Sequence, residues 1–269
     1  MQKTDLFIIA AGKGSRMNIN IPKALVPISD GEPNLTTMLK QIGHKFRTVF
    51  IVTNENIQDQ WMQYFNFSKD QDLFKNVVNV AITSGLGDGH AVMMGLNESD
   101  KILATMQMES ADDVVVCWGD VFIQYGEIVD ELLAHHLEVS TSAGIMPAVK
   151  EVNPYVTLLV DDALKCRSAD FSKYGENHPS GFHDQSIFRF KRNHLIDSLV
   201  SLHCSLWKNG RYMTQGGELS LLYTFHYLYN FGRGVKVYET DYPTLSFNTL
   251  DEVQSIQKEI NLKWKNNQS

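Results

Sequence analysis

Residues 6–17 read LFIIAAGKGSRM, an apolar run that leads into two glycines separated by a lysine. A continuous apolar run of this length is typical of a strand buried on both faces of a sheet. Similar runs return at residues 48–53, 77–82 and 114–118, and helical patterns lie between them at residues 34–42, 56–65 and 89–96. This alternation predicts an α/β fold with a parallel, doubly wound sheet.

The pattern loosens after Gly144. Residues 155–160 and 186–191 have the composition of strands, residues 218–229 have the pattern of an amphipathic helix, and residues 173–180 resemble a polar loop. We expect this second half to complete the same sheet. The prediction is a single domain over residues 1–262, followed by a frayed tail at residues 263–269.

The composition is that of an ordinary globular protein, with 269 residues of which 43% are hydrophobic and 20% charged. A chain of this length buries a large core. Its formal net charge of −7 argues against a nucleic-acid binder, because such proteins usually carry a basic surface that offsets phosphate charge. We therefore expect small molecules as partners and no nucleic acid.

The cysteines and the N-terminal residues indicate the compartment. Cys117, Cys166 and Cys204 are widely spaced and form no C-x-x-C pair, which fits a reducing cytosol. The apolar run at residues 6–11 is too short for a signal peptide or a membrane span. We expect a cytoplasmic protein with no membrane association.

The loop after the first strand has the features of a phosphate-binding loop. Gly12 and Gly14 let the backbone approach a ligand closely and present N–H groups to phosphate oxygens. Arg16 and Lys23 add positive charge beside them. The loop lacks the Lys-Ser/Thr ending of a Walker A motif and does not complete G-x-G-x-x-G, so neither of these motifs is favoured.

Further segments follow in a fixed order: PKALVPI at residues 22–28, LGDGHA at residues 86–91, Gly119-Asp120, and Phe247-Asn248-Thr249. Together with residues 10–17 they resemble the sugar-phosphate nucleotidyltransferase family. The nearest likeness is to the uridylyltransferase domain that acts on N-acetylglucosamine 1-phosphate. The resemblance implies a Rossmann-like, doubly wound mixed sheet of the nucleotide-diphosphosugar transferase type. It makes residues 1–143 the nucleotide-binding half and residues 144–262 the acceptor-binding half.

The resemblance implies an enzyme that transfers a nucleoside monophosphate from an NTP to a phosphorylated small molecule, releasing pyrophosphate, with Mg2+ as cofactor. Cell-surface polysaccharide biosynthesis is one setting for such an activity. Arg16 and Lys23 are the implied catalytic residues, and Asp120 and Asn248 the implied magnesium ligands. The implied nucleotide-binding residues are Ala10, Ala11, Gly12, Gly14, Ser15, Gly85, Gly87, Asp88 and Gly89.

The position of Asp120 supports a functional role independently. It follows a predicted buried strand, so its carboxylate should lie at the carboxyl edge of the sheet, where α/β proteins usually bind ligands. Magnesium often takes only one or two protein oxygens at such sites. A helix N-cap for Asp120 and a turn or cap role for Asn248 are the alternatives. We interpret His90 as a packing residue near the nucleotide and Trp118 as core or lid packing.

The chain departs from the uridylyltransferase pattern where the base is read. Gly85 stands where that pattern has a glutamine whose amide recognises uracil, and Asp88 stands where it has a threonine. Base choice is therefore open, and we favour CTP over UTP. Two alternatives are a sugar-1-phosphate uridylyltransferase and an enzyme that transfers GMP to the molybdenum cofactor. A third is a non-catalytic, nucleotide-binding regulatory protein.

The acceptor side departs further. The expected Tyr-Gly pair reads Tyr155-Val156, the expected Asn-Thr-Gly-Ile reads DQSI at residues 184–187, and the nearest match to an acidic-plus-lysine segment is Asp170 with Lys173. Tyr155, Asp170 and Asp184 are the predicted acceptor-binding residues. We expect an acceptor other than N-acetylglucosamine 1-phosphate. It could be a non-sugar phosphate, as in the phosphocholine cytidylyltransferases that residues 33–35 (PNL) loosely resemble.

Overall fold

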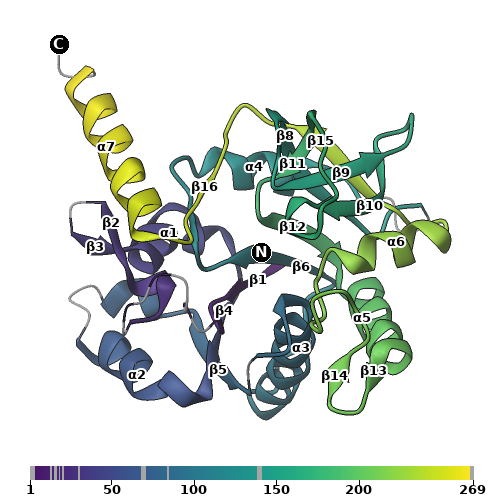
Figure 1. Ribbon diagram of the computed structural model, residues 1–269. Helices are drawn as coiled ribbons and strands as arrows, with labels where there is room; N and C mark the ends of the chain where they lie inside the picture. Colours follow the sequence, from purple (N-terminus) through teal and green to yellow (C-terminus); the bar gives the residue numbers. More distant parts are fainter. Residues whose placement is uncertain are drawn as a thin grey trace.

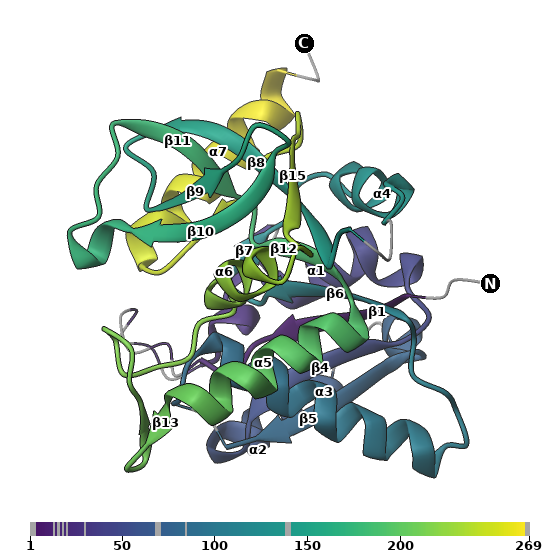
Figure 2. The same ribbon diagram turned by 90° about the vertical axis from the view of Figure 1, so that its right-hand side faces the viewer.

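The computed structural model describes residues 4–12, 14, 17, 19, 21–29, 31–67, 71–83, 85–137 and 141–266. Its centre is a ten-stranded sheet in the order β11-β9-β10-β15-β8-β12-β6-β1-β4-β5. One sheet therefore runs through both halves of the chain, as Figures 1 and 2 show. The mixed α/β architecture predicted from the sequence is confirmed.

The first half builds the parallel part of the sheet. Its strands are β1 (Thr4–Ile9), β4 (Val49–Asn54), β5 (Val77–Ile82) and β6 (Asp113–Trp118), and the β1–β4, β4–β5 and β1–β6 pairs are all parallel. The helices of this half are α1 (Asn34–Ile42), α2 (Gln58–Phe67), α3 (Asp88–Thr105) and α4 (Glu127–Ala134). The short strands are β2 (Pro27–Ser29), β3 (Glu32–Pro33) and β7 (Val121–Phe122).

The second half adds mostly antiparallel strands to the same sheet. They are β8 (Gly144–Val152), β9 (Val156–Val160), β10 (Lys165–Phe171), β11 (Ser180–Asp184), β12 (Ile187–Lys191) and β15 (Val235–Glu239). The strand β12 joins the halves, because it pairs with both β6 and β8. The remaining elements are α5 (Arg192–Leu206), α6 (Tyr223–Asn230), α7 (Leu250–Asn266), β13 (Trp207–Lys208), β14 (Arg211–Tyr212) and β16 (Leu245–Ser246).

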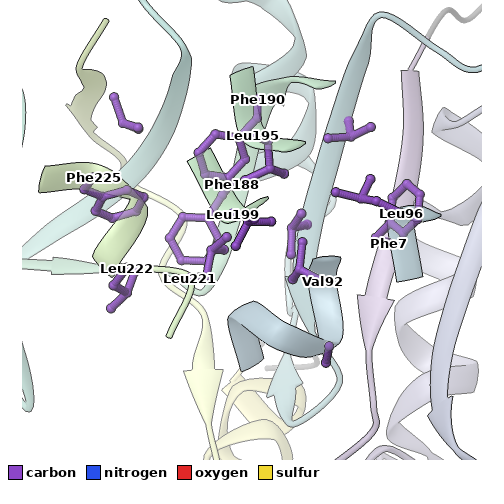
Figure 3. Packing of buried hydrophobic residues seen from close by; sticks show 14 of the residues in the cluster. Phe7, Val92, Leu96, Phe188, Phe190, Leu195, Leu199, Leu221, Leu222 and Phe225 are labelled. Carbon is purple, nitrogen blue, oxygen red and sulfur yellow. The ribbon is translucent and has the colours of Figure 1, made fainter. Parts of the chain in front are cut away.

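Helices cover both faces of the parallel strands, which explains why these strands are largely apolar. Along β1 the side chain of Phe7 packs into one core cluster, while Leu6 and Ile8 pack into the other. The first cluster includes residues of α3, α5 and α6, and Figure 3 shows Phe7, Val92, Leu96, Leu199 and Phe225 within it. The second cluster includes residues of α1 and α4.

Several predicted elements have different bounds in the structure. The helical pattern at residues 89–96 belongs to the longer α3, and the helix expected at residues 218–229 begins only at Tyr223. The reason is that Leu219 N donates to Leu86 O and Leu219 O accepts from Gly89 N, so the backbone groups of Leu219 bond to another segment and not within a helix. The helix α7 continues to Asn266, past Leu262, where a frayed tail was expected. In Figure 1 it projects from the body of the protein.

None of the helices in the described part of the chain is both long enough and apolar enough to cross a bilayer.

Candidate active site

A cavity of about 450 Å³ opens at the carboxyl ends of the parallel strands. Ala10, Ala11, Gly12 and Gly14 line it directly after β1. Gly14 has φ of 63°, a conformation that favours glycine, and a Cβ at Gly12 would meet nothing within 4 Å. The loop therefore leaves open space beside its backbone. The predicted residues Ser15 and Arg16 lie outside the described residues.

Lys23, Asp120 and Asn248 converge at one side of this cavity. The ammonium of Lys23 donates to Asp120 Oδ2 at 2.9 Å and to Asn248 Oδ1 at 2.8 Å. All three side chains line the cavity. Two oxygens that contact one ammonium point toward a common position.

Strand pairing brings Asn248 to this position from the far end of the chain. The strand β16 pairs antiparallel with β7, which follows Asp120, and Phe247 N donates to Asp120 O. The α7 N-terminus is a capping box: Glu252 Oε2 accepts from Thr249 N at 2.9 Å, and Thr249 Oγ1 accepts from Glu252 N at 3.3 Å. The cap of α7 is thus supplied by Thr249, and the side chain of Asn248 lines the cavity and accepts from Lys23 instead.

The oxygens of Asp120 and Asn248 fit magnesium. Mg2+ prefers hard oxygen ligands and often takes only one or two from the protein, with phosphates and water completing its shell. No group of three or more His, Cys, Asp or Glu side chains that could enclose a metal is found among the residues described. A metal held here would therefore depend on substrate oxygens as well as on these two side chains.

The start of α3 forms the opposite wall. Gly85 and Gly87 have φ of 102° and 101°, and both line the cavity with Leu86 and Asp88. Non-glycine residues rarely adopt such φ values. Position 85, where the uridylyltransferase pattern has glutamine, therefore has a backbone conformation suited to glycine. Any contact from residue 85 to a base would have to come from its backbone.

Asp88 ties α3 to the segment before α6. Its Oδ1 accepts from Leu221 N at 2.6 Å, and Gly89 N donates to Leu219 O at 2.9 Å. Part of Asp88 is exposed to the cavity. The surrounding protein atoms desolvate its carboxylate, which raises its pKa to about 6. The hydrogen bond from Leu221 N lowers the pKa by a smaller amount. Gly89 is buried against this segment and is not part of the cavity wall: a Cβ there would lie 2.7 Å from Ser220 C.

Several cavity-lining residues were not predicted as site residues, and those with polar or aromatic side chains are Thr83, His90, Trp118 and Glu218. Trp118 ends β6 directly before Gly119-Asp120, so its position beside a predicted ligand was a usable signal. It also packs on Phe188 at 5.5 Å between ring centroids, as a core residue would. His90 both packs and faces the cavity. Glu218 lines the cavity because the adjacent Leu219 is hydrogen-bonded to Leu86 and Gly89. No local sequence pattern marks Glu218 as a site residue.

The three predicted acceptor-binding residues do not line this cavity. Tyr155 lies just before β9 and is 46% exposed, and Asp170 Oδ2 lies 2.8 Å from His178 Nε2. Asp184 is buried, its Oδ1 accepts from Ser186 N, and burial raises its pKa. Their acceptor role stays a prediction. Lys173, the other acceptor candidate, is close enough to Asp88 to lower the pKa of that carboxyl.

Two glycines after the first strand, a lysine and two converging oxygens line one cavity at the carboxyl ends of the parallel strands, which is the arrangement of an NTP-binding α/β domain. The chain belongs to the MobA-like NTP transferase domain family, whose model matches residues 6–177. The likeness to sugar-phosphate nucleotidyltransferases drawn from the motifs is thereby confirmed.

Individual relatives agree with this assignment. The bifunctional protein GlmU of Acinetobacter baylyi is 31% identical over 147 residues, which cover 53% of this chain and 27% of that protein. GlmU of Bacillus cereus is 24% identical over 261 residues, which cover 95% of this chain and 51% of that protein. This chain thus spans about half or less of these relatives.

A solved structure extends the likeness of fold to the whole chain. UDP-glucose pyrophosphorylase complexed with UDP-glucose matches with a TM-score of 0.73 at 14% identity, covering 98% of this chain and 100% of that one. The nucleotide-diphosphosugar transferase type of fold is confirmed.

Proposed function

We propose that this protein transfers a nucleoside monophosphate from an NTP to the phosphate of a small phosphorylated acceptor and releases pyrophosphate. The observation that carries the proposal is the convergence of Lys23, Asp120 and Asn248 beside a glycine-containing loop in one cavity. Family membership and the likeness to GlmU support the same reaction class.

In this reaction an oxygen of the acceptor phosphate attacks the α-phosphorus of the NTP. The bond between the α-phosphorus and the oxygen bridging to the β-phosphate breaks, and that oxygen leaves with its electron pair on pyrophosphate. A phosphate oxygen already carries negative charge, so the attack needs no general base. Phosphoryl-type transfer depends mainly on positioning and on stabilising charge.

The chain's own residues have definite tasks in this scheme. Lys23 would bring an ammonium to the phosphates, and the backbone N–H groups of Gly12 and Gly14, which line the same cavity, would bind phosphate oxygens. Asp120 and Asn248 would hold Mg2+, which supplies positive charge that neutralises and orients the triphosphate. Arg16 is proposed to add a second cation.

We further propose CTP as the preferred nucleotide, with an acceptor other than N-acetylglucosamine 1-phosphate. The first part is supported by Gly85, which has no amide side chain to read uracil. The second is supported by Val156, the first residue of β9, which is buried and stands where the uridylyltransferase pattern has glycine. A non-sugar phosphate and another sugar phosphate both fit these departures.

A pyrophosphate-release assay tests the reaction class. The purified chain is incubated with Mg2+, each of the common NTPs, and a panel of sugar 1-phosphates and non-sugar phosphates such as phosphocholine. We expect one NTP and acceptor pair to release pyrophosphate, with the matching NDP-linked product detected by mass spectrometry. NTP binding without release for any acceptor would instead favour a nucleotide-binding regulatory protein.

A further inference from the structure

His90 connects the cavity to a buried polar network. It is the third residue of α3, it lines the cavity, and its Nδ1 lies 2.7 Å from Tyr212 Oη. The same hydroxyl lies 2.8 Å from His203 Nδ1. Tyr212 is only 1% exposed, so this network of two imidazoles and one hydroxyl is sealed from solvent at its centre.

The scaffold holds the three rings in place. Figures 1 and 2 show α3 beside α5, with the β13–β14 hairpin at the end of α5. His203 stacks on Trp207 at 5.7 Å between ring centroids, and Trp207 contacts the ring of Tyr212 at 4.9 Å. The backbone of His90 is fixed because the first turn of α3 is hydrogen-bonded to residues 219 and 221.

The position of the Tyr212 hydroxyl proton decides which groups of this network donate hydrogen bonds and which accept them. Burial raises the pKa of Tyr212 to about 12, so the hydroxyl keeps its proton. It can donate to one Nδ1 and must accept from the other, which therefore carries a proton. Two arrangements use the hydroxyl proton within this network, and they differ in which imidazole is the donor.

The two helix ends favour one of these arrangements. His203 lies in the last turn of α5, and His90 lies in the first turn of α3, where the positive end of the helix dipole disfavours a protonated imidazole. Burial, followed by the charge of His203, lowers the pKa of His90. In the arrangement that fits a neutral His90, His203 Nδ1 donates to Tyr212 Oη and Tyr212 Oη donates to His90 Nδ1.

A neutral imidazole that accepts at Nδ1 carries its proton at Nε2. Among the residues described, no side chain or backbone group is hydrogen-bonded to His90 Nε2. We infer that His90 donates this N–H to an uncharged oxygen of a substrate in the cavity, and that Tyr212 and His203 are positioning residues that select the tautomer. The inference rests on the proposed function, because it assigns a contact within the same cavity.

The chemistry of the contact follows from the neutral state of the ring. An imidazolium would be attracted to the phosphates that Lys23 is placed to bind, whereas a neutral N–H suits a carbonyl or hydroxyl oxygen. Two sources can supply such an oxygen: a carbonyl of the nucleobase or a hydroxyl of the acceptor. The kinetic experiment below distinguishes them.

The tautomer is measured without any turnover. Long-range 1H–15N correlation spectra of the 15N-labelled full chain separate the two tautomers, and the spectrum of His90→Gln identifies the His90 signals. We expect Nε2–H in the wild type and a loss of that preference in Tyr212→Phe, which removes only the hydroxyl. A His90 that is protonated at Nδ1 in the wild type overturns the inference and leaves the proposed function untouched.

The contact is measured with three variants of His90 and Tyr212. His90→Leu removes the donor, and His90→Gln keeps an N–H donor. Tyr212→Phe removes the hydroxyl that fixes the tautomer of His90. Loss of one neutral hydrogen bond costs roughly a three- to tenfold change in affinity. We expect His90→Leu to raise by that factor either the Kd of CTP and UTP or the KM of the acceptor, with kcat changed less, and His90→Gln to restore most of it.

If the Kd of the nucleotide rises, the nucleobase supplies the oxygen. If the KM of the acceptor rises, with glucose 1-phosphate and phosphocholine as the acceptors assayed, the acceptor supplies it. Unchanged affinities for every substrate in folded His90→Leu overturn the inference. A wild-type chain that binds nucleotide in the Nε2–H state without releasing pyrophosphate overturns the proposed function alone.

Discussion

The Lys23 ammonium lies 2.9 Å from Asp120 Oδ2, and both groups are partly shielded, with 15% and 31% of their side chains exposed. The pair joins two motifs that lie far apart in the sequence. Since Asn248 Oδ1 contacts the same ammonium at 2.8 Å, one cation bridges both predicted magnesium ligands. Lys23 therefore balances negative charge at the position where the phosphates and a metal would meet.

Removing this ammonium should slow the reaction without unfolding the protein. We expect Lys23→Ala to lower kcat by roughly 10²- to 10³-fold, because the loss of one preorganised electrostatic group has effects of that size. Lys40→Ala is the matched control, since Lys40 pairs with Glu32 on an exposed surface. Near-normal turnover by folded Lys23→Ala would show that its assigned role is wrong.

Activity should require a divalent cation. Excess chelator should abolish pyrophosphate release, and added Mg2+ or Mn2+ should restore it. Asp120→Asn keeps an oxygen but loses the charge that a hard cation prefers, so we expect at least a tenfold higher metal requirement, on the order of the losses seen when ligand support is removed. Asp130→Asn, in an exposed pair with Lys45, is the control. Full activity in chelator would exclude the metal model.

Asp88 should make stability depend on pH. Its pKa is raised from 3.8 to about 6, so between these values the folded state holds a proton that the unfolded state has lost. Stability from this group is therefore present below pH 4 and declines as pH rises toward 6. Asp88→Asn keeps an acceptor for Leu221 N but cannot titrate.

Thermal unfolding from pH 4.5 to 7.5 checks this expectation. The Tm of Asp88→Asn relative to wild type should increase as the pH rises. Asp184, whose pKa is also raised, is present in both proteins, so its effect on the Tm cancels in the difference. A Tm difference that stays constant with pH would contradict the prediction.

Gly87 and Gly12 should respond very differently to alanine. At Gly87 φ is 101° and a Cβ would lie 2.3 Å from Leu219 O, so we expect Gly87→Ala to lower the unfolding free energy by about 3 kcal/mol. At Gly12 a Cβ meets nothing within 4 Å, so Gly12→Ala should keep its stability and weaken NTP binding instead. Denaturant unfolding and nucleotide titration separate these effects; equal stability losses would refute the distinction.

Base and acceptor preference form the last prediction. We expect kcat/KM for CTP to exceed that for UTP, and N-acetylglucosamine 1-phosphate to be a poor acceptor. Sites built around particular hydrogen bonds reject analogues that lack them by roughly 10⁴-fold, so the difference should be visible in steady-state rates. If UTP with N-acetylglucosamine 1-phosphate is best by a wide margin, then Gly85 and Val156 do not have the effects inferred for them.

The parallel half of the fold was predictable because its signals are local. The predicted bounds of α1 and β5 agree with the structure residue for residue, since an apolar run or a helical period lies within a short window. The helix α5 and the strands β8, β10, β11 and β15 were not predicted. Several of these strands have polar residues on one side, so their apolar pattern is weak until a partner strand covers them.

The sequence by itself determined the family, the α/β class and the motif residues Lys23, Asp120 and Asn248, because glycine placement, apolar runs and motif order are properties of the chain. Only the tertiary structure decided what surrounds them. Pairing of β16 with β7 brings Asn248 to Lys23, and contact of residues 218–221 with α3 engages Asp88 and adds Glu218 to the cavity wall. It also joins His90, Tyr212 and His203. Such contacts depend on how distant segments pack together, and no local pattern of residues encodes that packing.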